Sequence, residues 1–238
     1  MQPLRILSTA FLAAGLAATC GVARATAPVP AFTAQYQVLQ NGAPIGTATL
    51  TLAPGPDDTW TFTTDSKGTA GLASLLAAST REVSTFKWVG AAPQGISYDY
   101  ELKSALKQKH RSVRFDWSAH TIDVDDNGTF QFPTQPGAIE RHTLPLALAA
   151  ELAAGKTTFD LPVAVRDRIE TQHYAAQGTG PRHVSVPAGT FDATRVSRTD
   201  GGAGIDAWFA PAKLPVPVKI EQSGKSSFTL ELESWSRN

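Results

Sequence analysis

The sequence predicts a mainly β protein, with a large, strongly curved antiparallel sheet or open barrel and two short helices packed on it. Apolar and polar residues alternate through most of the chain after residue 32, and Gly, Pro, Asn and Asp separate the alternating segments. Only two segments show helical spacing instead. Hydrophobic residues make up 42% and charged residues 18%, which is typical of a soluble globular protein rather than a disordered or fibrous one.

The first 25 residues have the pattern of a secretory signal peptide. Arg5 supplies a positive charge, residues 6–22 are mostly apolar, and Ala23-Arg24-Ala25 forms a small-residue cleavage site. A transmembrane anchor needs about 20 apolar residues, and polar residues interrupt this run. We therefore expect residues 26–238 to form a single mainly β domain that lies in the periplasm, begins at Thr26 and has no transmembrane segment.

Cys20 gives an alternative, in which the mature protein is anchored through a lipidated cysteine. Thr19, directly before it, fits a lipobox poorly, so we favour the cleaved form. That form loses the one cysteine of the chain, which excludes disulfides and thiolate metal ligands. The 21 basic and 21 acidic side chains balance, whereas a nucleic-acid-binding protein normally has a basic excess.

The alternating segments predict antiparallel strands in two groups, and no composition shift or fixed-period repeat divides the chain into further domains. The first group comprises residues 33–39, 45–52, 59–64, 82–89, 96–103, 107–116, 121–125 and 129–132. The second comprises residues 158–165, 168–175, 183–186, 191–198, 207–209, 216–222 and 227–234.

Two segments predict helices. Residues 69–79 have three leucines at helical spacing, which indicates a short amphipathic helix; these are Leu72, Leu75 and Leu76. Residues 143–154 give a stronger pattern, because Pro145 suits a first helical turn, Leu148 belongs to a row of leucines at four-residue steps, and Gly155 suits a helix end. Such leucines usually pack in the core, although they can also roof a ligand cavity.

A three-residue loop at 104–106 would place Glu101 opposite Lys109 and Asp99 opposite Arg111. This register bears on the single basic cluster of the sequence, which could bind an anionic headgroup. We favour an ion-pair ladder on the surface instead, because cross-strand carboxylates would neutralise much of the cluster. The cluster comprises Lys103, Lys107, Lys109, Arg111 and Arg114, with His110 among them.

The following turns, at Ser118-Ala119 and at residues 126–128, predict that Val124 lies opposite both Val113 and Phe130 on one apolar face. Strict alternation then places Tyr98 and Tyr100 on the other face of the sheet. Either a bulge in residues 107–116 reverses the faces, or the sheet has apolar groups on both surfaces because it curves around a cavity.

The sequence contains no clear catalytic, cofactor-binding or metal-binding motif. Residues 123–128 resemble the start of an EF-hand loop, but Thr134 at the twelfth position cannot supply the bidentate carboxylate, so a hairpin turn is favoured. The five histidines have no metal-site spacing, and neither G-x-S-x-G nor S-x-x-K occurs. Glu140-Arg141-His142 could hold a general base beside a carboxylate, but charged residues are common at helix entrances.

Several segments resemble an uncharacterised bacterial periplasmic family, the DUF3108-type proteins of unknown function. They are residues 32–36 (Phe-Thr-Ala-Gln-Tyr), 45–48 (Ile-Gly-Thr-Ala), 186–193 (Val-Pro-Ala-Gly-Thr-Phe-Asp-Ala), 207–209 (Ala-Trp-Phe) and 214–220 (Leu-Pro-Val-Pro-Val-Lys-Ile). The resemblance implies a mainly β protein of the cell envelope. It also implies distant similarity to lipoprotein-carrier half-barrels, whose open barrel and covering helices hold an acyl chain. It supplies no catalytic residues.

The resulting hypothesis is a non-catalytic periplasmic binding or carrier protein for a hydrophobic or amphiphilic envelope molecule such as a lipid. Its expected ligand-binding residues are Leu72, Leu75, Leu76, Leu148, Tyr98 and Tyr100. The main alternative is a structural or interaction protein of the envelope with an envelope protein as partner. A weaker one is a glycan-acting enzyme that uses Asp99 and Glu101 as its acids.

Overall fold

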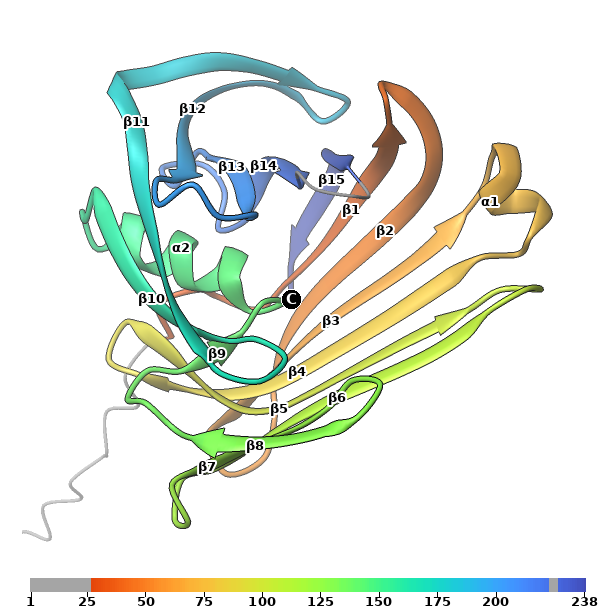
Figure 1. Ribbon diagram of the computed structural model, residues 1–238. Coiled ribbons are helices and arrows are strands. Elements are labelled where there is room, and N and C mark those ends of the chain that lie inside the picture. Colours follow the sequence, from red (N-terminus) through yellow and green to blue (C-terminus); the bar gives the residue numbers. More distant parts are fainter. Residues whose placement is uncertain (1–26, 223–226) are drawn as a thin grey trace, which may run out of the picture.

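A computed structural model describes residues 27–222 and 227–238, which form one curved sheet of 15 strands with two helices (Figure 1). This confirms the predicted mainly β class and the open, strongly curved sheet. The expected signal peptide and Cys20 lie outside the described residues.

The strands follow one another along the sheet in two meanders. The first contains β1 (Phe32–Gln40), β2 (Ala43–Pro54), β3 (Thr59–Gly68), β4 (Ser79–Val89), β5 (Ala92–Lys103), β6 (Gln108–Asp116), β7 (Thr121–Asp125) and β8 (Thr129–Pro133). The second contains β9 (Ile139–Glu140), β10 (Thr158–Ala164), β11 (Ile169–Val186), β12 (Gly189–Arg198), β13 (Ile205–Phe209), β14 (Pro217–Gln222) and β15 (Phe228–Arg237). Sequence reasoning missed β9 and divided β11 into two strands.

The first and last strands join the two meanders, because β1 pairs antiparallel with β15. The free edges of the sheet are therefore β8 and β9, which are neighbours in the sequence. The curvature brings these regions together: the amide of Gly95 donates to the carbonyl of Ala138 at 3.0 Å. The guanidinium of Arg166 also lies 4.8 Å from the ring centroid of Phe130. These contacts turn the curved sheet into a barrel-like enclosure.

Helix α2 (Leu144–Ala153) lies inside the curve of the sheet, near one end (Figure 1). It begins and ends close to the predicted positions, with Pro145 in the first turn and Gly155 at a φ of +84° after the end. Leu148 is fully buried in the main core, together with Phe32 and Phe62 of the sheet. The helix therefore fills the space between the two meanders at this end.

The first predicted helix is present as α1 (Gly71–Leu75), but it is shorter than the predicted residues 69–79 and has no buried residue. It has five residues and projects at the tip of the β3–β4 connection (Figure 1). Leu72 and Leu75 are 70% and 82% exposed. The reason is length: β3 and β4 extend further than expected, so only residues 69–78 remain to connect them. This segment is too short to return over the sheet.

The β5–β6 hairpin also differs from the expected register. Lys103 pairs with Gln108, so the loop spans residues 104–107 rather than 104–106. The amide of Lys107 donates to Ser104 Oγ at 3.0 Å, which closes the longer turn. A shift of one residue transfers every side chain of a strand to the other face. The next two hairpins have the predicted register, with Val124 opposite both Val113 and Phe130.

The corrected register removes the conflict between the two faces. Tyr98 now lies opposite Val113 and Tyr100 opposite Arg111, and the β5–β6 pairing has no bulge. The tyrosines therefore share a face with Val113 and the apolar residues of β7. The predicted bulge in residues 107–116 is therefore wrong. The sheet does curve around a cavity, but Tyr98 and Tyr100 lie on its concave face rather than on the opposite one.

Candidate functional site: an internal cavity with a polar and an apolar wall

The curved sheet encloses a cavity of about 890 Å³, and Pro145 of α2 contributes to its lining. Most polar and most apolar lining side chains lie on different strands, although Gln40 and Gln222 lie among the apolar ones and Phe62, Val113 and Val124 among the polar ones. The polar wall comes mainly from β3 to β6 and the segment before α2: Thr64, Ser66, Thr80, Glu82, Tyr98, Tyr100, Lys109, Arg111, Asp126, Glu140, Arg141 and His142. The apolar wall comes from β1, β2 and β13 to β15: Val38, Ile45, Leu50, Ile205, Ile220, Phe228 and Leu230.

Asp126 forms ion pairs with both cations that β6 directs into the cavity. Its carboxylate lies 2.9 Å from Lys109 Nζ and 2.6 Å from an Arg111 guanidinium nitrogen. Burial alone would raise the pKa of Asp126, but these two cations outweigh it and hold the pKa below the ordinary value. The predicted surface ladder is therefore wrong for Lys109 and Arg111.

Asp99 and Glu101 of the β5–β6 hairpin do form surface ion pairs, although with other partners than expected. Asp99 pairs with Arg114 at 2.8 Å and Glu101 with Lys103 at 2.7 Å. Neither carboxylate lines the cavity. Asp99 and Glu101 are thus poorly placed to act together on a glycan held there.

Tyr98 and Tyr100 of β5 line the polar wall, as expected for ligand-binding residues. The Tyr98 hydroxyl donates to Glu82 Oε2 at 2.6 Å. Burial, and then the Glu82 charge, raise the pKa of Tyr98, and burial likewise raises that of Tyr100. Both phenols therefore remain neutral and can donate hydrogen bonds.

Glu140 supports the backbone at the entrance to α2. Its buried carboxylate accepts hydrogen bonds from the amides of His142, at 2.6 Å, and Thr143, at 3.2 Å. The Thr143 hydroxyl also donates to it. Burial raises the pKa of Glu140. Sequence reasoning favoured a structural role for the charged residues at this helix entrance, and the contacts of Glu140 have that character.

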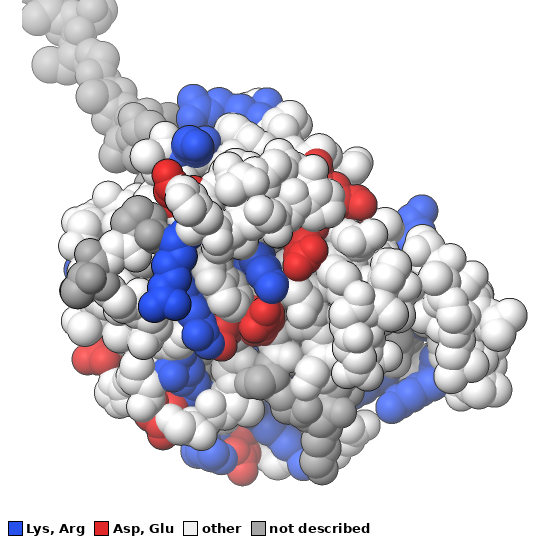
Figure 2. All heavy atoms as spheres, turned by 90° about the horizontal axis from the view of Figure 1, so that it is seen from above, with Lys and Arg blue, Asp and Glu red and all other residues white. Residues whose placement is uncertain are grey.

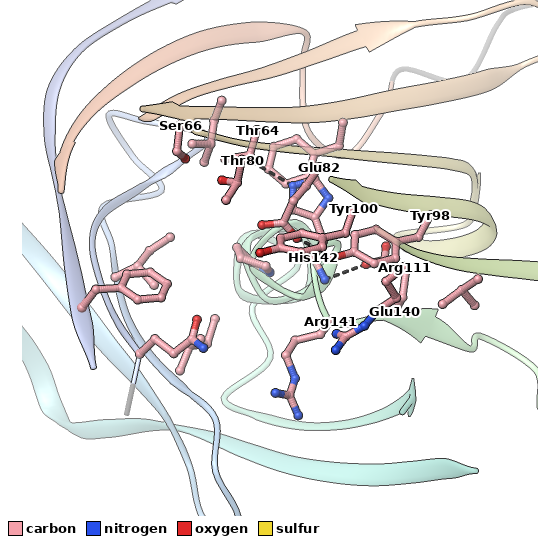
Figure 3. Close-up of a pocket in the computed structure, with 18 of the residues that line it drawn as sticks. Thr64, Ser66, Thr80, Glu82, Tyr98, Tyr100, Arg111, Glu140, Arg141 and His142 are labelled. Atoms are coloured by element: carbon pink, nitrogen blue, oxygen red, sulfur yellow. Dashed lines mark hydrogen bonds between the residues drawn. The ribbon is translucent and has the colours of Figure 1, made fainter. Parts of the chain in front are cut away.

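His142 lies between two hydroxyl groups. Its Nδ1 is 2.7 Å from Ser84 Oγ. Its Nε2 is 2.9 Å from Thr64 Oγ1 (Figure 3). Ser84 and His142 are the residue types of a nucleophile and its base. However, Ser84 is fully buried, so a molecule in the cavity does not reach its hydroxyl. Because a hydroxyl engages each ring nitrogen, the arrangement suits binding and positioning better than nucleophilic catalysis.

Arg141 is a cation of the cavity that remains available, whereas Arg166, which also lines the cavity, donates to the carbonyl of Asn127 at 3.4 Å and lies over the Phe130 ring. The Arg141 side chain extends away from the Glu140 and His142 contacts (Figure 3). Among the residues that the structure describes, no carboxylate pairs with it. By contrast, Lys109 and Arg111 are paired with Asp126. The carboxylate of Glu140 is buried, its pKa is raised, and it accepts hydrogen bonds from backbone amides. An anion in the cavity would therefore find an unpaired guanidinium.

The other expected ligand-binding residues do not line the cavity. Leu72, Leu75 and Leu76 lie on or beside α1, and Leu148 faces the core. Sequence reasoning weighed Lys109 and Arg111 as part of an anionic-headgroup site but favoured a surface ladder, and it gave Arg141 no ligand-binding role. The sequence signal that could have identified Lys109 and Arg111 was the length of the β5–β6 loop. A loop of four residues, rather than three, directs both side chains toward the cavity.

The described part of the chain holds no group of three or more His, Cys, Asp or Glu side chains placed to bind a metal ion. Asp126, within the EF-hand-like segment, instead bonds to Lys109 and Arg111 in a hairpin turn. Within the same described residues, no helix has the length and apolar character needed to cross a bilayer.

The fold and the cavity together define a barrel-like protein with an internal, two-walled pocket. The chain belongs to the family described as Protein of unknown function (DUF3108), whose model matches residues 32–233. It is also similar to the crystal structure of a beta-barrel-like protein of domain of unknown function DUF1849 from Brucella abortus. That similarity covers 90% of this chain and 100% of the other, with a TM-score of 0.53 and 9% identity, so it shows the fold alone. No curated protein matches the chain.

Proposed function

We propose that this protein is a non-catalytic binding or carrier protein for an amphiphilic molecule of the cell envelope with an anionic headgroup. The observation that carries the proposal is the division of one cavity into an apolar wall and a polar wall that contains an unpaired Arg141. The cavity volume, about 890 Å³, is within the range of small-molecule sites, roughly 300–1,000 Å³.

The apolar wall suits the hydrocarbon part of such a ligand. Side chains such as Leu50, Ile220 and Leu230 offer no hydrogen bonds, so they favour apolar surface that water would otherwise cover. The polar wall suits the headgroup: the Tyr98 hydroxyl already donates to Glu82, but Tyr100 and Arg141 offer further donors. A purely apolar ligand would leave these groups without partners inside the cavity.

The signal-peptide pattern of residues 1–25 supports export, and with it a periplasmic location where an envelope ligand would be available. N-terminal sequencing of the exported protein should find Thr26 as the first residue. An acylated Cys20 would instead place the protein on a membrane.

Titration with a dansylated fatty acid, which combines a carboxylate with an apolar chain, tests the proposal. Arg141→Gln should weaken binding about tenfold, because it removes a charge-assisted hydrogen bond. Arg182→Gln is a matched control, since Arg182 lies on β11 and does not line the cavity. A dansylated fatty alcohol should bind the wild type and Arg141→Gln with similar affinity.

Two results would contradict the proposal: no saturable binding by the wild type, or equal affinity of the wild type and Arg141→Gln for the fatty acid. Native mass spectrometry of the protein purified from its own envelope gives an independent check. A co-purifying lipid supports a carrier. A mass equal to that of the protein alone, together with no probe binding, would favour the structural or interaction role.

A further inference from the structure

Exposed apolar side chains gather on one projection of the molecule. Among the described residues, the exposed large hydrophobic side chains are Leu72, Leu75, Leu106 and Val89. The first three belong to α1 and the β5–β6 loop and are 70%, 82% and 81% exposed, respectively. We call residues 69–78 and 104–107 the leucine projection. Single exposed leucines are common, but three of the four in one place indicate a contact surface.

Backbone hydrogen bonds hold the two parts of the leucine projection together. The amide of Ala105 donates to the carbonyl of Leu76 at 2.9 Å, which joins the β5–β6 loop to the end of α1. The amide of Thr69 donates to the carbonyl of Ile45 at 2.9 Å. Because Ile45 lines the cavity, the projection stands at the cavity rim.

Lysines surround these leucines. Lys67, Lys103 and Lys107 are exposed at the adjoining ends of β3 and β5 and in the β5–β6 loop. Lys103 pairs with Glu101, whereas Lys67 and Lys107 have no carboxylate partner among the described residues. The view from above shows the lobe on the right, where α1 projects, as largely uncharged, with basic side chains beside it (Figure 2). The local excess of charge is therefore positive.

We infer that the leucine projection docks on an anionic lipid bilayer and turns the cavity rim toward it. Exposed leucines gain from insertion among acyl chains, and neighbouring lysines attract anionic headgroups. A protein partner fits less well, because lysine is depleted in protein interfaces. Three leucines on a short helix and a loop also predict reversible attachment rather than permanent anchoring. This inference is independent of the proposed function.

Flotation with vesicles of phosphatidylglycerol and phosphatidylethanolamine tests the docking surface. The wild type should bind these vesicles and should bind phosphatidylcholine vesicles much more weakly. Leu75→Glu and Leu106→Glu should each weaken binding about tenfold, because each removes the burial of one leucine. Lys67→Gln and Lys107→Gln should each weaken it about fivefold, and the losses should shrink as salt rises.

Val89→Glu is the matched control, since Val89 is 58% exposed but lies at the end of β4 remote from α1. It should bind vesicles like the wild type. Each variant changes an exposed side chain, so its melting temperature should stay close to that of the wild type. The inference is overturned if the wild type does not float with anionic vesicles. It is also overturned if the leucine variants bind like the wild type, or if Val89→Glu loses as much binding as they do.

The two proposals fail in different assays. Binding of the dansylated fatty acid in solution, without vesicles, should be unchanged in Leu75→Glu and Leu106→Glu. Conversely, Arg141→Gln should float with vesicles like the wild type.

Discussion

The imidazole of His142 stacks on the ring of Phe62, with ring centroids 4.5 Å apart and an angle of 21° between the planes. Phe62 belongs to β3, and His142 lies just before α2. The stack, together with the hydrogen bonds of the imidazole to Ser84 and Thr64, attaches the helix entrance to the first meander. Because Arg141 directly precedes His142, these contacts of His142 also hold the backbone of Arg141 in place.

His142→Ala should lower the free energy of unfolding by roughly 1–3 kcal/mol, because it removes the stack and one hydrogen-bond partner of the buried Ser84 hydroxyl. Ser84→Ala should cost less in the His142→Ala background than in the wild type. Urea unfolding of the two single variants and the double variant measures this coupling. His183→Ala, at an exposed histidine, should stay within about 0.5 kcal/mol of the wild type. If the losses of stability in Ser84→Ala and His142→Ala simply add in the double variant, the hydrogen bond between Ser84 and His142 is contradicted.

Asp126→Asn should destabilise the protein by roughly 1–3 kcal/mol at neutral pH, because it leaves Lys109 and Arg111 in the cavity without their counter-ion. The pKa of Asp126 is lower in the folded protein than its ordinary value of 3.8. Its stabilising contribution is therefore complete above that value and is lost as the pH falls through the lower, folded pKa.

Urea unfolding of the wild type and Asp126→Asn between neutral pH and acid checks this sign. The difference in stability between the two proteins should shrink once the pH falls below about 3.8. Asp123→Asn is a control, because Asp123 lies on the neighbouring β7 and accepts a hydrogen bond from Gln131 but forms no ion pair among the described residues. A constant difference across the whole pH range would contradict the role given to Asp126.

Leu148→Ala should lower the free energy of unfolding by roughly 2–5 kcal/mol, the range for truncation of a buried leucine. Leu148 is fully buried in the core and does not line the cavity. Binding of the dansylated fatty acid by the folded variant should therefore remain unchanged. Leu75→Ala, at an exposed leucine, should change stability by about 0.5 kcal/mol or less. Weaker probe binding with little loss of stability would show that α2 roofs the ligand instead.

The sequence predicted the fold class, α2 and most strands because these depend on local alternation and helix-end residues. The β7–β8 hairpin was predictable for the same reason, since Asn127 and Gly128 specify its turn. The β5–β6 loop was not, because its fourth residue is set by a hydrogen bond between Ser104 and Lys107. That one residue decided which charges face the cavity.

The features that the sequence did not predict depend on contacts between segments far apart in the chain. Leu72, Leu75 and Leu76 have the spacing of an amphipathic helix, but the lengths of β3 and β4 determine that no core lies beneath them. Glu140 resembles any surface acid at a helix entrance, yet the two meanders close over it. Strand β9 has two residues and pairs in parallel with β10, so it has too little sequence for an alternation pattern.

The pairing of β1 with β15 also constrains the order of events when the chain folds. Phe32 lies opposite Arg237, so the first strand finds this partner only when almost the whole chain is present. Contacts of such sequence separation slow folding, because a long loop must close before they form. A chain that lacks residues 228–238 would leave both β1 and β14 with an open edge, and such edges favour aggregation. Premature termination near the end of this protein should therefore be far more harmful than its distance from the cavity suggests.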